Sequence, residues 1–209
     1  MEADPVTLAP PAPLTAAAPG ASGPWFAPAP GATPHLLERA RRGDLSAFRE
    51  ILHLHEDRVY TLALRLVRVR EDAEELSQDV FVSLHRHLAD IVSGEHLRYW
   101  LRRTVCHRAI DRLRRRAAAP AVPLEAAAEL EDPATPADPL LVRRLRELIG
   151  RLPPVPRAAL LLRYQEDLDP PEIARTLGVP LNTVKSHLRR SLALLRGRCG
   201  ELDGQEQRS

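Results

Sequence analysis

The sequence predicts an all-α protein of two small helical domains joined by a flexible acidic linker, with a helix-turn-helix in the second domain. Three observations support this prediction. From His35 onward apolar residues recur at helical spacing, and no strand-like alternation of useful length interrupts them. Residues 117–139 hold five prolines, five acidic residues and no basic residue, which is typical of a linker. A glycine at position 178 separates two short amphipathic segments.

The domain boundaries follow from composition. Residues 1–34 contain nine prolines and much alanine, which favours a disordered tail over a packed core. We therefore divide the chain into a disordered tail (1–34), a first helical domain (35–116), a linker (117–139), a second helical domain (140–200) and a flexible tail (201–209).

The first domain is expected to begin with a capped helix and to end with two amphipathic ones. Gly43 and Asp44 predict a chain break followed by a helix cap. Two later helices, over about residues 72–88 and 97–116, are each expected to bury one stripe: Ala73, Leu76, Val80 and Leu84 in the first, and Leu97, Leu101, Val105, Ala109 and Leu113 in the second. In the second domain we expect helices over about residues 140–151, 156–166, 170–177 and 182–198.

The segment from Glu172 to Leu188 is typical of a helix-turn-helix. Gly178 lies where the tight turn needs a residue without a Cβ penalty, and Asn182 or Thr183 is expected to cap the second helix. The buried side of that helix is predicted to be Val184, Leu188 and Leu192, and its polar side carries Lys185, Ser186, Arg189 and Arg190. These donors suit DNA phosphates and base edges in a major groove.

Basic residues are concentrated in the two predicted domains. The first carries 17 arginines and 13 acidic residues, for a net charge of +4, and the second carries 12 basic and 5 acidic residues, for +7. The linker between them carries five acidic residues and is −5. Two basic lobes separated by an acidic spacer predict polyanion binding at two places.

The most basic segment runs from Arg98 to Arg116. It contains eight arginines against one acidic residue, Asp111, and Tyr99 and Trp100 stand at its start. Positive charge beside aromatic rings suits a single-stranded nucleic acid, because unstacked bases need a flat partner. A solvated basic face is the alternative, and the length of the nearly unopposed run makes it the weaker one.

An acidic stripe has the opposite character. Asp72, Glu75 and Asp79 lie at positions i, i+3 and i+7 of a predicted helix, so their carboxylates share one face. Carboxylates repel DNA, so this face is expected to meet a basic protein partner or water. The spacing alone favours water.

Several function classes are excluded. The sequence has no glycine-rich phosphate loop, no dinucleotide fingerprint after a strand and no nucleophile elbow, so we expect neither an enzyme nor a cofactor or small-molecule substrate. The pairs His53/His55 and His85/His87 are two residues apart. On a helix such neighbours point away from each other, which disfavours a metal site.

Localisation is inferred from two features. No apolar run reaches the length of roughly 18 residues that a membrane helix needs, so no membrane insertion is expected. Cys106 and Cys199 lie in different predicted domains and are expected to be free thiols in a reducing cytoplasm. Cys106, beside Val105 on the apolar stripe, is expected to be buried.

Four runs in order give the sequence a resemblance to a known family. They are Asp72-Ala73-Glu74-Glu75-Leu76-Ser77-Gln78-Asp79-Val80-Phe81, the arginine-rich run from Tyr99 to Arg115, the run from Leu152 to Tyr164, and Thr183-Val184-Lys185-Ser186. The chain resembles bacterial RNA polymerase sigma factors of the sigma-70 family, extracytoplasmic-function (ECF) group. The resemblance covers about residues 36–198.

The resemblance implies a transcription initiation factor that binds RNA polymerase core and promoter DNA, and possible control by an anti-sigma factor. It assigns three sets of residues. Core polymerase binding falls to Asp72, Glu75, Leu76, Gln78, Asp79 and Phe81, of which Leu76 and Phe81 pack either that interface or the lobe's own core. Melting and reading of the minus-ten element fall to Trp100, Arg103, His107, Arg108, Asp111, Arg112 and Arg115. Reading of the minus-thirty-five element falls to Asn182, Thr183, Lys185, Ser186, His187, Arg189 and Arg190.

Two departures and one alternative accompany the resemblance. The family usually has asparagine where this chain has His107, so recognition of the flipped base is expected to differ in detail. It commonly has arginine where this chain has His187, so we expect either weaker phosphate binding or a different base preference at the minus-thirty-five element. The alternative is a stand-alone helix-turn-helix regulator of the two-component or quorum-sensing type, since those proteins share the Thr-Val-Lys-x-His pattern of Thr183 to His187. Such a regulator needs a receiver or ligand domain upstream, and no alternating strand pattern provides one.

Overall fold

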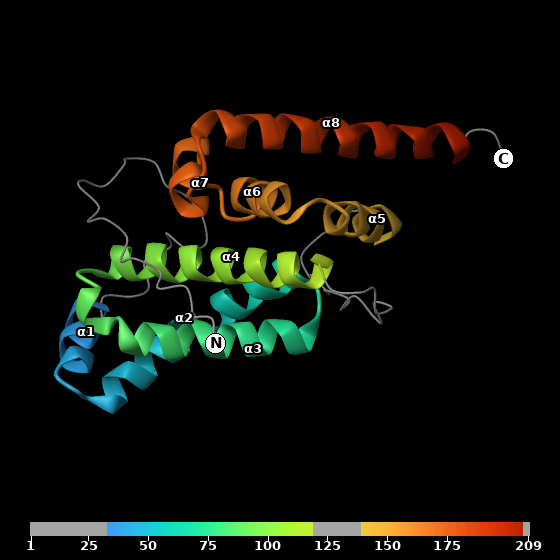
Figure 1. Cartoon of the computed structure of the whole chain (residues 1–209). Helices are drawn as coiled ribbons and strands as arrows, with labels where there is room; N and C mark the ends of the chain where they lie inside the picture. The colour runs from blue at the N-terminus through green and yellow to red at the C-terminus, as the bar shows by residue number, and fades with distance from the viewer. Residues whose placement is uncertain (1–32, 119–138, 207–209) are drawn as a thin grey trace.

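A computed structural model describes residues 33–118 and 139–206, and these residues form two helical lobes without a strand (Figure 1). The first lobe contains α1 (Thr33–Arg41), α2 (Leu45–Val67), α3 (Arg70–Arg86), the 3-10 helix η1 (Leu88–Asp90) and α4 (Gly94–Ala118). The second contains α5 (Pro139–Gly150), α6 (Pro154–Tyr164), α7 (Pro170–Leu177) and α8 (Leu181–Glu206). The all-α prediction is confirmed. The body of the predicted linker and nearly all of the predicted amino-terminal tail lie outside the described residues.

The expected break at the start of α2 is confirmed. Gly43 adopts a φ of 89°, which turns the chain after α1. Asp44 then caps α2, because its Oδ1 accepts hydrogen bonds from the backbone N–H groups of Ser46 (2.9 Å) and Ala47 (3.2 Å). Hydrogen bonds from the Ser46 hydroxyl and the Arg39 guanidinium hold the pKa of the Asp44 carboxyl well below its usual range.

The predicted apolar stripes of α3 and α4 form the core of the first lobe. All four stripe residues of α3 are buried, and so are Leu97, Leu101, Val105 and Ala109 of α4. Leu113 is only half-buried near the end of α4. The helix runs two residues further than predicted, to Ala118, because alanine continues a helix readily.

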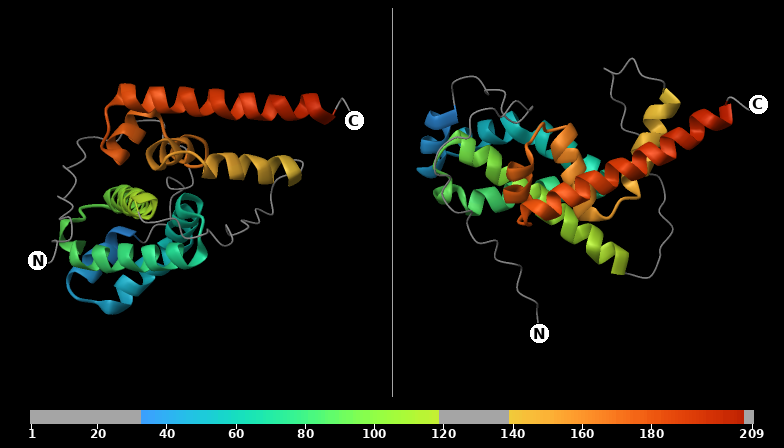
Figure 2. Two further views of the ribbon diagram at one scale, coloured as in Figure 1. Left: turned by 45° about the vertical axis from the view of Figure 1, so that its right-hand side comes forward. Right: turned by 90° about the horizontal axis from the view of Figure 1, so that it is seen from above.

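The α4 helix is buried on a second side that the sequence does not predict. It lies between α2 and α3 on one side and α6 and α7 on the other (Figures 1 and 2). Arg102, which lies off the apolar stripe, is only 3% exposed. One hydrophobic core therefore runs through both lobes, from Leu37 in α1 to Val184 in α8.

Local chemistry explains the helix-turn-helix. Asp169 and Glu172 form a capping box at the start of α7, with Glu172 N–H donating to the Asp169 carboxylate (2.7 Å) and Asp169 N–H donating to the Glu172 carboxylate (2.9 Å). Gly178 ends α7 in the left-handed conformation, with a φ of 66°, as the turn requires.

The start and end of α8 differ from the predictions. The helix begins at Leu181, and the N–H groups of Thr183 and Val184 donate to the Pro180 carbonyl (2.9 and 3.2 Å), so Asn182 and Thr183 lie within the first turn and do not cap it. The helix also continues to Glu206, so most of the expected flexible tail after residue 200 is helical. Glutamate, leucine and glutamine in this stretch favour that continuation.

Candidate nucleic-acid interface

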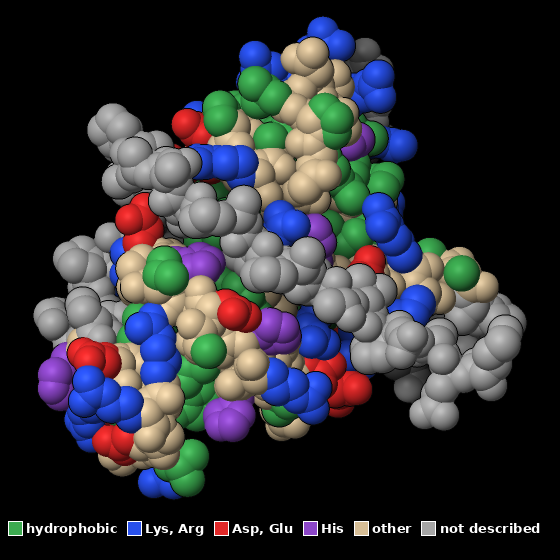
Figure 3. Space-filling view, turned by 60° about the vertical axis from the view of Figure 1, so that its left-hand side comes forward, with side chains coloured by type: hydrophobic (Ala, Val, Ile, Leu, Met, Phe, Trp, Pro, Cys, Tyr) green, Lys and Arg blue, Asp and Glu red, His purple; other side chains and the backbone are tan. Residues whose placement is uncertain are grey.

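The polar side of α8 is accessible as the sequence predicts. Of the seven residues assigned to the minus-thirty-five element, four are exposed: Asn182, Lys185, Arg189 and Arg190. The other three, Thr183, Ser186 and His187, are half-buried. On the opposite side Val184 and Ser191 are buried against the lobe. Figure 3 shows lysine and arginine side chains gathered at the upper end of the molecule, where α8 lies.

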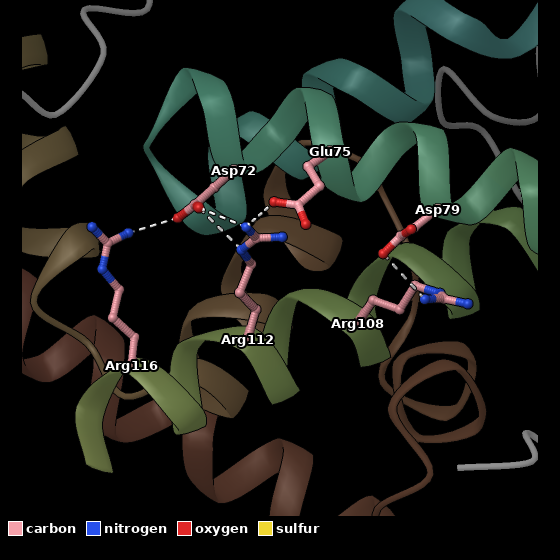
Figure 4. Close-up of polar contacts among 6 residues, drawn as sticks. All are labelled: Asp72, Glu75, Asp79, Arg108, Arg112 and Arg116. Carbon is pink, nitrogen blue, oxygen red and sulfur yellow. Dashed lines mark hydrogen bonds and ion pairs between the residues drawn. The ribbon is translucent and has the colours of Figure 1, made fainter. Parts of the chain in front are cut away.

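The acidic stripe of α3 lies directly against arginines of α4 (Figure 4). Asp72 accepts hydrogen bonds from Arg112 Nε (3.0 Å) and from Arg116 Nη1 (2.6 Å), and Arg112 also pairs with Glu75. A looser ion pair, of 3.5 Å, joins Arg108 Nη1 to Asp79 Oδ2. We call these six residues the α3–α4 ion-pair ladder: Asp72, Glu75, Asp79, Arg108, Arg112 and Arg116.

The ladder brings together two sets of residues that the sequence assigned to separate partners. Arg108 and Arg112, expected to contact the minus-ten element, are counter-ions of carboxylates expected to contact polymerase. Arg116, which no earlier expectation singled out, joins them. The signal for it was present, since Arg108, Arg112 and Arg116 are four residues apart and face carboxylates at helical spacing on α3.

Asp72 is the best-enclosed carboxylate of the ladder, with a side chain 18% exposed. Asp72→Asn is expected to lower the free energy of unfolding by roughly 1 kcal/mol, because it weakens pairs with two arginines. The melting temperature should fall by about 3 °C. At 1 M salt, where the screening length is about 3 Å, most of the difference should disappear.

Glu71→Gln is the matched control for Asp72→Asn. It removes the same charge at an exposed position one residue earlier on α3. Its melting temperature should stay within about 1 °C of the parent chain. A loss for Asp72→Asn that is undiminished at 1 M salt would assign Asp72 a packing role and contradict the ion-pair interpretation.

Two residues assigned to contact surfaces, Trp100 and Leu76, lie inside the lobe instead, and a third, Phe81, is half-buried on its core. Trp100 is 3% exposed, with its ring centroid 5.9 Å from that of His87, and Leu76 is 2% exposed. Phe81 is half-buried and packs on the same core. Apolar side chains of this size stabilise the fold by leaving water, so we remove Trp100 and Leu76 from the proposed contact surfaces as a correction. Gln78, Asp111 and Arg115 are exposed as expected.

Two other residues that the sequence assigned to the minus-ten element lie against the second lobe. Arg103 Nη1 donates to the Arg175 carbonyl (2.8 Å), and His107 Nε2 donates to the Thr176 carbonyl (3.0 Å). The Tyr99 hydroxyl also donates to the Arg175 carbonyl (3.2 Å). Burial and the nearby Arg103 charge lower the pKa of His107, so its neutral form is favoured here.

A buried polar cluster lies beside these contacts. Glu166, in the loop between α6 and α7, is 4% exposed and interacts electrostatically with Arg102 of α4. Burial raises the pKa of Glu166 to about 7 and that of the Cys106 thiol to about 12. The expectation that Cys106 is a buried free thiol is confirmed. Sequence reasoning missed Glu166, because an acidic residue in a polar loop gives no signal of burial.

Arg157 of α6 connects the lobes at a third place. Its Nη1 donates to the Leu66 carbonyl near the end of α2 (2.8 Å), and its Nη2 donates to the Leu152 carbonyl (3.0 Å) and to that of Gly150. A single guanidinium therefore satisfies the last carbonyls of a helix in each lobe. Burial lowers the pKa of Arg157 to about 10, which leaves it charged at neutral pH.

Within residues 33–118 and 139–206, no group of three or more His, Cys, Asp or Glu side chains is arranged to hold a metal ion. In the same two stretches, none of the helices combines the length and the apolar character needed to cross a membrane.

Comparison with known proteins identifies the family. The family model described as "Sigma-70 region 2" matches residues 51–119, and the one described as "Sigma-70, region 4" matches residues 142–195. The ECF RNA polymerase sigma factor SigM of Mycobacterium tuberculosis is 32% identical over 168 residues, which cover 80% of this chain and 85% of that protein. SigW of Bacillus subtilis, another ECF sigma factor, is 25% identical over 179 residues (79% and 96%).

Solved structures share the fold. CnrH in complex with the cytosolic domain of CnrY matches with a TM-score of 0.57 and 22% identity, over 82% of this chain and 99% of that one. The sigma factor RpoE from Bartonella quintana, in complex with the anti-sigma factor NepR, matches with a TM-score of 0.61 and 20% identity (73% and 96%). The chain belongs to the sigma-70 family of RNA polymerase sigma factors, in the ECF group.

Proposed function

We infer that the chain is a transcription initiation factor that binds RNA polymerase core and directs it to specific promoters. One observation carries this inference: the sigma-70 region 2 and region 4 matches cover the two lobes separately, one over α2–α4 and the other over α5–α8. Each lobe presents its own basic helix, α4 in the first and α8 in the second. A protein with both regions contacts a promoter at two elements while it is held on one polymerase.

In the second lobe we propose that α8 enters the major groove of the minus-thirty-five element. Its first turns present Asn182, Lys185 and Arg189 to solvent, while Val184 anchors the helix to the lobe. An α-helix fits the major groove, and each good base contact contributes about 1–3 kcal/mol of discrimination. His187 is half-buried on this helix and is proposed to modify the sequence preference.

In the first lobe we propose that α4 captures the melted minus-ten strand. Arg103, His107 and Arg108 supply donors, and exposed Arg115 adds charge near the end of the helix. Tyr99, which is half-buried, replaces the buried Trp100 as the aromatic group in the proposal. Basic side chains with one accessible ring suit a single strand, whose affinity comes from phosphate contacts and base stacking.

Polymerase core is proposed to bind the exposed side of α3. Glu75, Gln78 and Asp79 are exposed there, and their side chains are supported from behind by the buried stripe of the same helix. Glu75 and Asp79 also belong to the ion-pair ladder, where they pair with Arg112 and Arg108. A basic polymerase surface would compete with these arginines for the two carboxylates. Binding of core would thereby free arginines for DNA.

A stand-alone regulator of the two-component or quorum-sensing type is not favoured, because region 2 of the sigma-70 family accounts for the lobe that would have to be a receiver. We propose no catalytic role for the chain and place it in the cytoplasm with its polymerase. An anti-sigma factor is proposed as a further partner, since the solved CnrH and RpoE structures are complexes of that kind or with a cytosolic protein domain.

The test is in vitro transcription with purified core polymerase on genomic fragments, followed by mapping of the start sites. The chain should form a complex with core and produce transcripts that share two upstream elements. Without core, the same chain should produce no transcript. DNA binding and regulation that proceed with no complex between the chain and core would reject the proposal and restore the stand-alone regulator.

A further inference from the structure

His55 of α2 is a buried histidine whose ring makes no hydrogen bond to the described protein. The residue is 1% exposed. Within residues 33–118 and 139–206, neither Nδ1 nor Nε2 of this ring has a hydrogen-bond partner. An imidazole always carries at least one N–H donor, and leaving a buried donor unpaired is unfavourable. Such a group indicates a partner that is neither backbone nor side chain, namely a water molecule or an ion.

Two arginines hold their guanidinium groups near this ring. Arg58 lies three residues after His55 and on the same side of α2, and Arg98 lies on α4, which packs against α2. Both positive charges act on His55, and they also act on each other. Arg58 Nη1 and Arg98 Nε are buried as well, and in the part of the chain that the structure describes no acceptor reaches either nitrogen. Donors therefore collect at this point of the α2–α4 interface without an acceptor to receive them.

The nearby carboxylates do not complete this group of donors. Glu95 acts on the charge of Arg98 and Glu166 acts on that of Arg58, but neither carboxylate accepts a hydrogen bond from the buried nitrogens. The α3–α4 ion-pair ladder is different, because there Asp72 accepts hydrogen bonds from two arginines. The repulsion between the guanidinium groups near His55 is thus only partly offset by the described residues.

The unused donors define the chemistry of a ligand. Guanidinium N–H groups donate and cannot accept, and a protonated imidazole behaves in the same way. An anion with several oxygens satisfies such donors together and also relieves their repulsion, whereas a water molecule does only the first. The planar fork of arginine matches the oxygens of phosphate or sulfate. Because the donor atoms are enclosed, a small free ion suits them better than a large organic ligand.

We propose that the first lobe binds a small tetrahedral oxyanion between α2 and α4, held by His55, Arg58 and Arg98. The bound ion offsets the repulsion between the two arginines and links the two helices. The first lobe is therefore more stable with the ion than without it. The site uses none of the residues proposed for polymerase core, the minus-ten strand or the minus-thirty-five element, so it stands whether or not those surfaces act as proposed.

Thermal melting of the full chain tests the site. Sulfate is the probe because it remains a dianion near neutral pH, and sodium chloride at the same ionic strength is the reference. For a dissociation constant of about 1 mM, about 20 mM sulfate should raise the melting temperature of the parent chain by about 4 °C. Arg58→Gln and Arg98→Gln should each lose most of that rise. Arg49→Gln removes one positive charge from an exposed position of α2 and, as the matched control, should keep the rise.

The His55 ring reports on the site in the parent chain itself. Burial and the charges of Arg58 and Arg98 lower the pKa of His55 to about 4. A bound dianion favours the protonated ring, so this pKa should rise by about one unit in sulfate, a tenfold change in proton affinity. Nuclear magnetic resonance of the chain with isotope-labelled histidine follows the titration. His55→Leu identifies the resonance by its absence.

Two further ligands distinguish the sources of the oxyanion. Inorganic phosphate at the concentration used for sulfate should reproduce the rise in melting temperature. AMP presents the same phosphoryl oxygens on a nucleoside. An equal rise with AMP assigns the site to a phosphoryl group, whether free or attached, and a rise with phosphate alone assigns it to the free ion.

Two outcomes overturn the proposal. One is a sulfate-induced rise in melting temperature that is as large in Arg58→Gln and Arg98→Gln as in Arg49→Gln, because sulfate then acts on the whole surface. The other is a His55 resonance of the parent chain that does not respond to sulfate. In that case water satisfies the buried donors, and no anion binds between α2 and α4.

Discussion

Replacing Asp79 by arginine is expected to weaken binding of the chain to RNA polymerase core by about a hundredfold, or about 2.7 kcal/mol. The Asp79 side chain is 55% exposed on α3, beside the exposed Gln78, and its ion pair with Arg108 is as long as 3.5 Å. A carboxylate so loosely held is available to a basic partner. Arginine at this position converts an attraction into a repulsion. Titration of fluorescent chain with purified core measures the change.

The control for Asp79→Arg exchanges the two members of the pair. Asp79→Arg combined with Arg108→Asp restores an ion pair between α3 and α4 but leaves the charge on the α3 surface reversed. We expect the double variant to melt like the parent chain and still to bind core weakly. Recovery of core binding in the double variant would show that Asp79 serves the lobe internally and would reject its assignment to the polymerase surface.

Replacing Lys185 or Arg190 by alanine is expected to change which minus-thirty-five sequences the holoenzyme uses. Both side chains are exposed on the first turns of α8, where a recognition helix meets base edges. A lost base contact should reduce transcription from the preferred sequence by about 5- to 150-fold, corresponding to about 1–3 kcal/mol, and should affect other sequences less. Transcription from a promoter library randomised at the minus-thirty-five element gives the profile.

Arg196→Ala is the matched control on the same helix. Arg196 is exposed but lies about three turns beyond Lys185, nearer the far end of α8. Its loss should leave the sequence profile unchanged. If Lys185→Ala instead weakens all sequences uniformly, and the dependence of binding on salt becomes shallower, Lys185 contacts a phosphate and does not read bases.

Features that depend on nearby residues were predictable from the sequence. Asp44 caps the helix that follows it, and Gly178 adopts the positive φ that its turn needs. The α3 stripe was predictable as well, because burial of Ala73 and Leu76 follows from a repeat within one helix. Each of these features is determined by residues within a few positions of one another along the chain.

Features that depend on distant segments were not predictable from the sequence. Arg102 is a charged residue in a run of arginines, and only the arrival of the second lobe buries it. Glu166 belongs to the second lobe and is buried where that lobe meets the arginines of the first. Trp100 was assigned to DNA because it adjoins basic residues, but a large apolar ring gains more from the core beneath α4. The α3–α4 ion-pair ladder was partly predictable from the sequence. The charges on the two helices have matched spacing, but that spacing indicates pairing only once the packing of the helices is known.

The core that passes through both lobes also affects how the molecule loses its structure. Leu101, Val105 and Cys106 of α4 belong to one continuous set of packed residues with Ile173 of α7. While the lobes are in contact, unfolding of one lobe exposes apolar core residues of the other to water. The two lobes are therefore expected to unfold as one cooperative unit. Lobes that stand apart are small domains with little core each. A partner that separates the lobes must therefore cover the apolar surface that each lobe buries against the other.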